Sequence, residues 1–368
     1  MPDGFSVHHA AELADALLAW YAVHRRDLPW RRTKDSYRIW VSEIMLQQTR
    51  VTAVIPYYER FLERFPTVRA LAEAELSEVL ALWQGLGYYA RARSLHRAAR
   101  IVVSEHGGQL PADREALLRL PGIGDYTVGA LLSIAFGQDA VALDGNVKRI
   151  LARLFDYAGE SSTTAAKRTL EGYARALLPT GRARQFNQAL MDLGTSVCLP
   201  GVPACGACPI APYCLARERG VQELRPLRAR RGPNPTVQMV AAYLKRDDGR
   251  WLIARRRPQG LLGGLWELPT FSVPSDAGEP LATFLITALQ QELHVAAQIG
   301  EELLNVAHGY THFNVRVRVY DCCISGEPAL HEHQTWDALH WLAQDELADY
   351  GLTGVTVKTL EKLQGTLW

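Results

Sequence analysis

Four cysteines near the middle of the chain have the residue type and spacing of a metal-binding loop. They are Cys198, Cys205, Cys208 and Cys214, with six, two and five residues between successive members. Thiolates are the usual protein ligands of iron–sulfur clusters, and four of them complete the ligand set of one cubane. Four prolines among them disfavour regular helix, so we expect a folded loop around an inorganic core. The spacing favours a cluster over tetrahedral zinc and over a disulfide framework, which remain the alternatives.

Glu43 is the first residue whose surroundings suggest acid–base chemistry. It lies in a segment that looks helical, 37–51, between aliphatic and aromatic neighbours. Such surroundings disfavour a charged carboxylate and raise its pKa, so that Glu43 can hold a proton near neutrality as a general acid does. Considered by itself, Glu43 could instead lie on the solvent-exposed face of an amphipathic helix. Gln48 and Thr49 follow it, and their uncharged polar groups are suited to hydrogen bonds with the edges of nucleobases.

Residues 120–130 predict a helix, a glycine hairpin and a second helix. Gly122 and Gly124 allow a close turn whose amide groups point outward, and the next helix N-terminus adds a positive dipole. We therefore expect the hairpin to bind a phosphate. Downstream, Asp144 precedes another helix, where the commonest role of an aspartate is to cap the N-terminus.

Aromatic side chains stand beside arginines in two further segments. Trp30 adjoins Arg31, and Tyr88 follows a glycine turn that leads into a helix with Arg93, Arg97 and Arg100 on one face. In the second segment the combination suits a wedge in a base stack together with phosphate contacts, whereas Trp30 by itself fits packing in the core equally well. Buried aromatics beside a solvated basic face would give the same pattern.

The length of 368 residues favours two domains, and 48% hydrophobic and 21% charged residues are typical of globular proteins. Residues 1–235 hold 30 Lys and Arg against 23 Asp and Glu, whereas residues 236–368 hold 10 against 16. A polyanion partner would therefore bind the first part. The amino terminus has no targeting pattern and no apolar run is long enough to span a bilayer, so we expect a cytoplasmic protein.

The secondary-structure pattern changes along the chain. Helical periodicity dominates the first part, and residues 216–235 are charged and rich in Pro and Gly, which is typical of a linker. Beyond it, residues 237–244 and 251–254 around an Asp-Asp-Gly turn predict a hairpin, 314–320 alternate as a strand, and 281–293 look helical. The second part is expected to be α+β.

Taken in order, six pieces of the chain resemble the MutY family of adenine DNA glycosylases, within the helix-hairpin-helix superfamily. They are Leu-Pro-Trp-Arg from Leu28, Ser-Glu-Ile-Met-Leu-Gln-Gln-Thr from Ser42, the Gly-Leu-Gly-Tyr-Tyr segment from Gly85, the hairpin, Leu-Asp-Gly-Asn-Val-Lys-Arg from Leu143, and the cysteines. The resemblance implies a multidomain protein: an all-α glycosylase domain over 1–215 with a cluster loop at 198–214, a linker at 216–235, and a Nudix-like domain over 236–368. It further implies one [4Fe–4S] cluster, a monomer, and a nucleoid location while the protein is on DNA.

The resemblance also implies an activity and a set of site residues. The enzyme would flip adenine out of a mispair with 8-oxoguanine or guanine in duplex DNA and hydrolyse its glycosidic bond. Glu43 would protonate N7 of the base, and Asp144 would stay ionised beside the oxocarbenium-like sugar, with Tyr126 and Asn146 assisting. Trp30, Arg31 and Gln188 would line the adenine pocket; at the last position the resemblance implies Glu, so Gln188 is a departure from the pattern. Contacts to DNA and the lesion would come from Gln48, Thr49, Leu86, Tyr88, Gly122 and Gly124.

The second domain resembles a MutT-like (Nudix) fold that reads 8-oxoguanine. The loop Gly263-Gly-Leu-Trp-Glu-Leu-Pro fits, but Leu289-Gln-Gln-Glu-Leu stands where the acidic run for catalytic magnesium is needed. Pyrophosphate hydrolysis is therefore not expected. Tyr310, Thr311 and His312 align with an aromatic-Ser-His hairpin that contacts the lesion, and Cys322 and Cys323 are expected to be plain strand residues.

Three alternatives differ in testable ways. An endonuclease III-like glycosylase/lyase shares fold and cysteine spacing but needs a lysine amine after the hairpin, where this chain has Tyr126. A non-catalytic DNA-binding redox sensor would use the cysteines without the carboxylates. A nucleotide-pool hydrolase is disfavoured by the missing acidic run.

Overall fold

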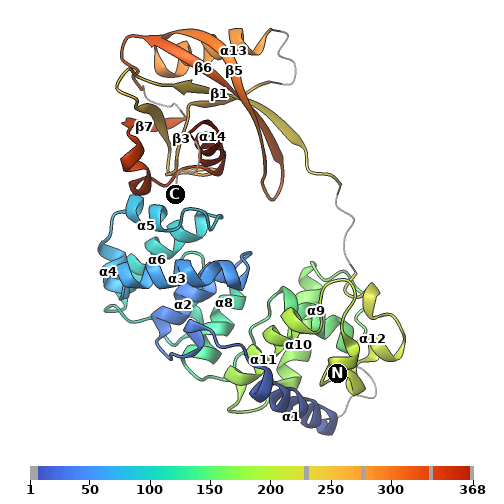
Figure 1. Cartoon of the computed structure of the whole chain (residues 1–368). Helices are drawn as coiled ribbons and strands as arrows, with labels where there is room; N and C mark the ends of the chain where they lie inside the picture. The colour runs from blue at the N-terminus through green and yellow to red at the C-terminus, as the bar shows by residue number, and fades with distance from the viewer. Residues whose placement is uncertain (1–6, 228–231, 275–278, 331–334, 365–368) are drawn as a thin grey trace. The chain divides into compact units, whose positions relative to one another are not determined.

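Contacts divide the chain into two units, each described here by itself (Figure 1). The computed structural model describes residues 7–227, 232–274, 279–330 and 335–364. The first unit comprises residues 1–73 and 94–231, and the second comprises 74–93 and 232–368. The helix α6 (Ala90–Glu105) begins in the second unit and continues into the first.

The described part of the first unit is helical, as the sequence predicted. Its longer helices are α1 (Val7–His24), α2 (Ser36–Leu46), α3 (Val51–Arg64), α9 (Gly145–Leu154), α10 (Thr164–Leu177) and α11 (Ala183–Ser196). Shorter elements are η1 (Pro29–Arg31), α4 (Val68–Glu73), α7 (Arg114–Arg119), α8 (Asp125–Ala130), the π-helical η2 (Leu131–Ala135), η3 (Cys205–Ala207), η4 (Ala211–Tyr213), α12 (Leu215–Glu218) and η5 (Gln222–Leu224).

Helix α2 is buried on nearly every side. Asp35 caps it by accepting hydrogen bonds from the backbone N–H groups of Tyr37 and Arg38, and every residue from Ile39 to Met45 is buried. An α-helix that is buried all round needs apolar side chains on all faces, which the sequence supplies apart from Ser42 and Glu43. Glu43 therefore lies inside the unit, and the alternative that it lies on a solvent-exposed helix face is wrong.

Helices α1, α9, α10 and α11 share a second core in this unit. Leu13, Leu17 and Tyr21 repeat every four residues along α1 and are buried, and α9 contributes Val147, Ile150, Leu151 and Leu154 to the same cluster. Burial of such a side chain stabilises the fold by about 1.5–3 kcal/mol. Because the first turn of α9 carries Asp144 and Asn146, this core fixes the place of both.

The described part of the second unit is α+β, with two sheets and several helices. One sheet has the order β4-β1-β6-β5 and the other β3-β2-β7. The strands are β1 (Thr236–Leu244), β2 (Trp251–Arg256), β3 (Trp266–Glu267), β4 (Thr270–Ser272), β5 (Ala296–Gly309), β6 (Asn314–Ser325) and β7 (Trp336–Leu342). The other elements are α5 (Leu76–Leu82), α13 (Leu281–Leu293), η6 (Gln344–Asp349) and α14 (Gly354–Gln364). Cys322 and Cys323 lie in β6, as expected.

The predicted hairpin between residues 237–244 and 251–254 is wrong in its pairing. Both segments are strands, but β1 pairs in parallel with β6 and β2 pairs antiparallel with β7, so they belong to different sheets. A single bridge, Lys245 to Trp251, joins them next to the turn. Both strands are rich in buried residues, and the sequence alone does not show which neighbour satisfies their backbone groups.

The expected domain boundary also differs from the structure. Residues 216–227, predicted as the start of a linker, stay with the first unit, where Arg219 and Arg225 each pair with Asp156 at 2.7 Å. The arginines that suggested a solvated linker are thus held by a carboxylate. Residues 74–93, expected in the glycosylase domain, belong to the second unit, where Gln84 Oε1 accepts from the backbone N–H of Leu352 at 3.2 Å.

Across the described ranges, none of the helices is both long enough and apolar enough to cross a membrane.

Candidate active site

Glu43 is the central buried carboxylate of the first unit. Its side chain is on α2, the residue is 4% exposed, and its Oε2 accepts a hydrogen bond from the Tyr126 hydroxyl on α8 at 2.7 Å. Burial raises the pKa of Glu43 to about 7, and the negative charge of Asp144 acts in the same direction. The Tyr126 hydrogen bond and the Arg31 charge oppose the rise. Glu43 can therefore hold a proton near neutral pH.

Asp144 is both the N-cap of α9 and a member of this site. Its Oδ1 accepts from the Val147 backbone N–H at 2.7 Å, and its Oδ2 accepts from Asn146 Nδ2 at 3.0 Å. Burial raises the pKa of Asp144, while these two hydrogen bonds and the Arg149 charge act to lower it. Hydrogen bonds donated to a carboxylate favour its ionised form. The N-cap reading of Asp144 is confirmed, and it coexists with a place next to Glu43.

Asn146 is fixed in place by a hydrogen bond from a buried arginine. Its Oδ1 accepts from Arg149 Nη2 at 2.9 Å, and Arg149 also donates to the carbonyl oxygens of Gly194 and Cys198 at 2.7 and 2.9 Å. Gly194 is required here, since a Cβ at that position would lie 2.6 Å from the Cβ of Asn146. The sequence reasoning gave Arg149 no role, although it falls in the same motif.

The chain leading to Asp144 is held by Asn187, which the sequence reasoning also missed. This residue of α11 is 1% exposed. Its Oδ1 accepts from the Ala142 backbone N–H at 3.3 Å, and its Nδ2 donates to the Ala140 carbonyl at 2.8 Å. Gly129 lets the chain pass close by, because a Cβ there would lie 1.8 Å from the Val141 carbonyl oxygen. The only signal in the sequence was a polar residue on the apolar face of a predicted amphipathic helix.

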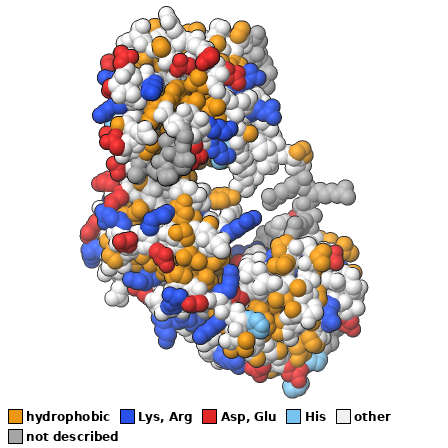
Figure 2. Space-filling model, viewed as in Figure 1, with side chains coloured by type: hydrophobic (Ala, Val, Ile, Leu, Met, Phe, Trp, Pro, Cys, Tyr) orange, Lys and Arg blue, Asp and Glu red, His pale blue; other side chains and the backbone are white. Residues whose placement is uncertain are grey.

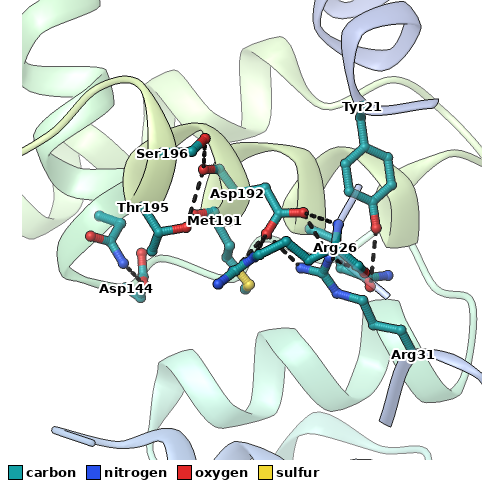
Figure 3. A network of polar contacts seen from close by, with 10 residues as sticks. Tyr21, Arg26, Arg31, Asp144, Met191, Asp192, Thr195 and Ser196 are labelled. Atoms are coloured by element: carbon teal, nitrogen blue, oxygen red, sulfur yellow. Dashed lines mark hydrogen bonds and ion pairs between the residues drawn. The ribbon is translucent and has the colours of Figure 1, made fainter. Parts of the chain in front are cut away.

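A cluster of charged side chains surrounds Asp192 on the helix α11, and Figure 3 shows it in the same view as Asp144. Arg26 and Arg31 converge on Asp192 of α11, with Nη2 of Arg26 2.6 Å from Oδ1 and Nη1 of Arg31 2.6 Å from Oδ2. Gln188 joins this cluster through Tyr21, whose hydroxyl donates to Gln188 Oε1 at 3.3 Å. Trp30 is buried and packs edge-on against Tyr58, with ring centroids 5.3 Å apart.

The four cysteines of the central loop line one cavity. Its other lining residues include Ile150, Arg153, Leu193 and Ile210, and its empty volume of about 400 Å³ includes some open solvent. The thiols lie close enough for Cys198, Cys205 and Cys214 to add to the rise in the pKa of Cys208, although burial is the larger cause. All six cysteines are among the described residues, and each is a free thiol. Within the described ranges, no three His, Cys, Asp or Glu side chains converge closely enough to hold a single metal ion.

The segments predicted to touch DNA differ in how they are built. Gln48 is exposed and has φ = +60°, and Tyr88 in the second unit is 44% exposed with φ = +53°. A non-glycine residue in the left-handed region is strained, and such strain concentrates at functional sites. Gly122 has φ = +78° and lies close to Ser94, so the hairpin needs a glycine there, whereas open space surrounds Gly124. Leu86, by contrast, is buried in the second unit.

The turn between β5 and β6 carries Tyr310, Thr311 and His312. Thr311 and His312 are exposed, whereas Tyr310 is partly buried between His308 and Phe313, with ring centroids 4.7 and 4.9 Å away. Burial raises the pKa of Tyr310 to about 12, so its hydroxyl stays neutral. Within the second unit, Thr311 Oγ1 lies 3.5 Å from the Tyr88 hydroxyl.

On the face shown in Figure 2, Lys and Arg side chains are interspersed with Asp and Glu side chains. The excess of basic residues in the first part of the chain therefore does not by itself mark a DNA-binding track on this face.

Comparison with known proteins agrees with the helical and α+β folds of the two units. The HhH-GPD superfamily of base excision DNA repair proteins matches residues 41–175, and the NUDIX domain family matches residues 240–362. A solved thermostable thymine-DNA glycosylase aligns with 58% of this chain and 98% of its own, at 32% identity and a TM-score of 0.54. The helical unit and these matches define a helix-hairpin-helix DNA glycosylase, an enzyme that hydrolyses N-glycosyl bonds in DNA.

Two relatives narrow the assignment. The human adenine DNA glycosylase is 34% identical over 95% of this chain and 73% of its own length. The adenine DNA glycosylase of Buchnera aphidicola subsp. Acyrthosiphon pisum is 32% identical over 82% of this chain and 83% of its own. The chain belongs to the adenine DNA glycosylase family.

Proposed function

We propose that this enzyme removes adenine mispaired with 8-oxoguanine, or with guanine, in duplex DNA by hydrolysis without strand cleavage. The observation that carries the proposal is the Glu43–Tyr126–Asp144 constellation, in which a carboxyl group with a pKa of about 7 lies beside a second carboxyl group that accepts two hydrogen bonds. Two carboxyl groups in different environments can divide the acid and anion roles of glycoside hydrolysis.

In this proposal Glu43 is the general acid. Protonated Glu43 donates its proton to N7 of the flipped adenine, and the bond from N9 to C1′ of the sugar breaks with its electron pair moving onto the base. Tyr126 donates to Oε2 throughout and so leaves Oε1 for the transferred proton. The resulting Glu43 carboxylate then accepts a proton from the water that attacks C1′, which restores the acid and gives adenine and an abasic site.

Asp144 would supply the negative charge that stabilises the positive sugar. Its carboxylate is fixed by the backbone of α9 and by Asn146, so little reorganisation is needed when the charge develops. Asn146 would help to place the attacking water. Repulsion between the two carboxyl groups supports the assignment, since ionised Asp144 favours the protonated form of Glu43.

The remaining site residues would bind the DNA. Trp30, Arg31 and Gln188 would line the adenine pocket, and the hairpin at Gly122 and Gly124 would hold a phosphate. Gln48 and Tyr88 would enter the base stack, a role supported by their exposure and strained backbone. Thr49 and Leu86 would lie beside the oxidised guanine.

The Nudix-like domain over residues 236–368 would recognise 8-oxoguanine opposite the adenine. Exposed Thr311 and His312 on the β5–β6 turn support this role. Glu267, in the matching loop, is 5% exposed and paired with Arg256 at 2.7 Å, so it is poorly placed to bind magnesium. We further propose that the protein is a monomer of the cytoplasm, associated with the nucleoid while bound to DNA.

A glycosylase assay tests the substrate and the absence of lyase chemistry together. We expect adenine release to be fastest from A:8-oxoguanine, slower from A:G, and absent for thymine glycol opposite A. Borohydride is expected to trap no covalent adduct, because Tyr126 stands where a Schiff base would need a lysine. Release of thymine glycol, or a trapped adduct with the wild-type chain, would instead support the endonuclease III-like alternative.

The cysteine cavity is proposed to hold one [4Fe–4S] cluster, ligated by Cys198, Cys205, Cys208 and Cys214. The shared cavity and the coupling among the thiols fit a four-thiolate ligand set. A bound cluster would cross-link a loop that has only two single-turn helices, η3 and η4, between its cysteines.

Anaerobically purified protein is therefore expected to contain iron and acid-labile sulfide in equal amounts, about four of each per chain, as one [4Fe–4S] cluster requires. Cys208→Ser is expected to lower the iron content and the melting temperature. Cys322→Ser, at a buried cysteine outside the loop, is the control and is expected to keep its iron. Zinc without iron in the wild-type protein would contradict the proposal.

A further inference from the structure

Asp192 is a buried carboxylate at the edge of the proposed base pocket with no role assigned so far. Its side chain is 2% exposed, and it receives the guanidinium groups of two arginines from different segments. Nη1 and Nη2 of Arg31 lie 2.6 and 2.9 Å from its two oxygens, a bidentate arrangement, and Nε of Arg26 lies 2.7 Å from Oδ1. Figure 3 shows the two guanidinium groups converging on this one side chain of α11.

Other contacts make the cluster rigid around Arg31. Arg31 Nη1 also donates to the Arg26 carbonyl at 3.1 Å, and its guanidinium lies 5.8 Å from the centre of the Tyr21 ring. Tyr21 in turn donates to Gln188, whose Nε2 donates to the Arg184 carbonyl at 3.1 Å. Bidentate Arg–carboxylate pairs fix orientation as well as distance. The position of Arg31 therefore depends chiefly on Asp192.

The cluster has an unequal charge balance. Two arginines face one aspartate, and the network continues through Tyr21 to Gln188, which is neutral. The charges of Arg25 and Arg184 also act on Tyr21. Arg31 is the one group of this cluster whose charge acts on Glu43, where it lowers the pKa against the effects of burial and of Asp144. Tyr126 is the other group that lowers it, through its hydrogen bond. Asp192 carries the opposite charge 2.6 Å from Arg31, so its field opposes that of Arg31 in sign.

We propose that Asp192 is a positioning residue for base excision: it holds Arg31 at the wall of the base pocket and offsets part of the Arg31 charge, so that Glu43 keeps its proton. The inference rests on the proposed function, because it assigns Asp192 an effect on the acid step of that reaction. A purely structural ion pair would stabilise the fold and leave the chemistry of the folded enzyme unchanged.

Asp192→Asn tests the proposal in the full-length enzyme. We expect the single-turnover rate of adenine release to fall by about 10- to 100-fold, as small misplacements of site residues do, with unchanged affinity for the duplex. The fall should be larger at alkaline pH: without the Asp192 charge, Arg31 favours the Glu43 carboxylate more strongly, and the alkaline limb of the rate moves to lower pH. A rate unchanged from wild type, or reduced by the same factor at every pH, would overturn the proposal.

Asp156→Asn is the matched control, because Asp156 is also largely buried and also pairs with two arginines, Arg219 and Arg225. It is expected to lower the melting temperature without moving the pH profile. Asp192→Glu keeps the negative charge but displaces the carboxylate, so it should lower the rate of adenine release while leaving the alkaline limb of the pH profile in place. If Asp192→Asn does not fold, Asp192→Glu replaces it as the test of the positioning role.

A double variant separates action through Arg31 from an independent effect. If Asp192 acts through Arg31, Arg31→Gln with Asp192→Asn should be no slower than Arg31→Gln alone. Additive losses would contradict this route. The proposed function itself would be refuted if the wild-type enzyme released no adenine, or if the Glu43→Gln variant were fully active. Either result differs from a failure of the Asp192 assignment, in which the wild-type enzyme and Glu43→Gln behave as proposed.

Discussion

Glu43→Gln is expected to slow adenine release by about 10²- to 10⁴-fold, the usual contribution of a positioned general acid. Glutamine keeps the size of the side chain and can still accept the Tyr126 hydrogen bond, but it has no proton to donate at neutral pH. Duplex binding should remain, which separates an enzyme from a DNA-binding redox sensor. In the wild-type enzyme the rate should fall as the pH rises through about 7, where Glu43 loses its proton.

The same substitution should not destabilise the protein at alkaline pH. The folded pKa of Glu43 lies above its ordinary value, so the folded state binds more protons than the unfolded state between about 4.5 and about 7, and stability falls as the pH rises through this window. Glutamine does not titrate and so removes this loss of unfolding free energy, which amounts to at most about 3 kcal/mol at pH values above about 7. Thermal melts at pH 8 check that the lost activity is not lost folding.

Glu267→Gln is the control for Glu43→Gln, because Glu267 is the second buried glutamate of the described chain. It accepts hydrogen bonds from Arg256 at 2.7 Å and from Trp336 at 2.9 Å, so its substitution should weaken the second unit. The rate per folded molecule should be unaffected. Comparable adenine release by Glu43→Gln and the wild type would remove Glu43 from the mechanism.

Local signals in the sequence were enough to predict much of the fold and the key site residues. The helix predicted at 281–293 has those bounds as α13, because apolar periodicity and Pro280 define it locally. Asp144 caps α9 as its position before a helix predicted. Glu43 is buried because apolar neighbours occupy all sides of α2. In each case the cause lies within a few residues of the effect.

Features that depend on distant partners could not be predicted. Parallel pairing of β1 with β6 joins residues nearly eighty positions apart, and the turn between β1 and β2 suggested a nearer partner. Asn187 and Asp192 are polar residues on α11, and the residues they hold lie on other elements of the first unit. A sequence shows that such residues break an apolar face but not which groups they contact. The arginines of 216–227 misled the linker prediction for the same reason.

Asp144→Asn is expected to slow adenine release by about 10³-fold, the scale on which one preorganised electrostatic contact acts in other enzymes. Asparagine caps a helix N-terminus about as well as aspartate, so the hydrogen bond from Val147 and the start of α9 should persist. The variant therefore removes the negative charge while keeping the cap, which makes it more informative than alanine at the same position.

Two controls make the Asp144 result interpretable. Asp113→Asn changes another aspartate N-cap, which accepts from the Ala116 backbone N–H at 2.8 Å, and should alter neither rate nor melting temperature appreciably. Asn146→Ala reports the loss of the Asn146–Asp144 hydrogen bond by itself, because Asp144→Asn also disturbs that bond by putting an amide nitrogen in place of one carboxylate oxygen. If Asp144→Asn releases adenine as fast as the wild type, Asp144 is a helix cap alone, and the positive charge on the sugar must be stabilised by another group. A large loss with an unchanged melting temperature, beyond that of Asn146→Ala, would leave the charge of Asp144 as its cause.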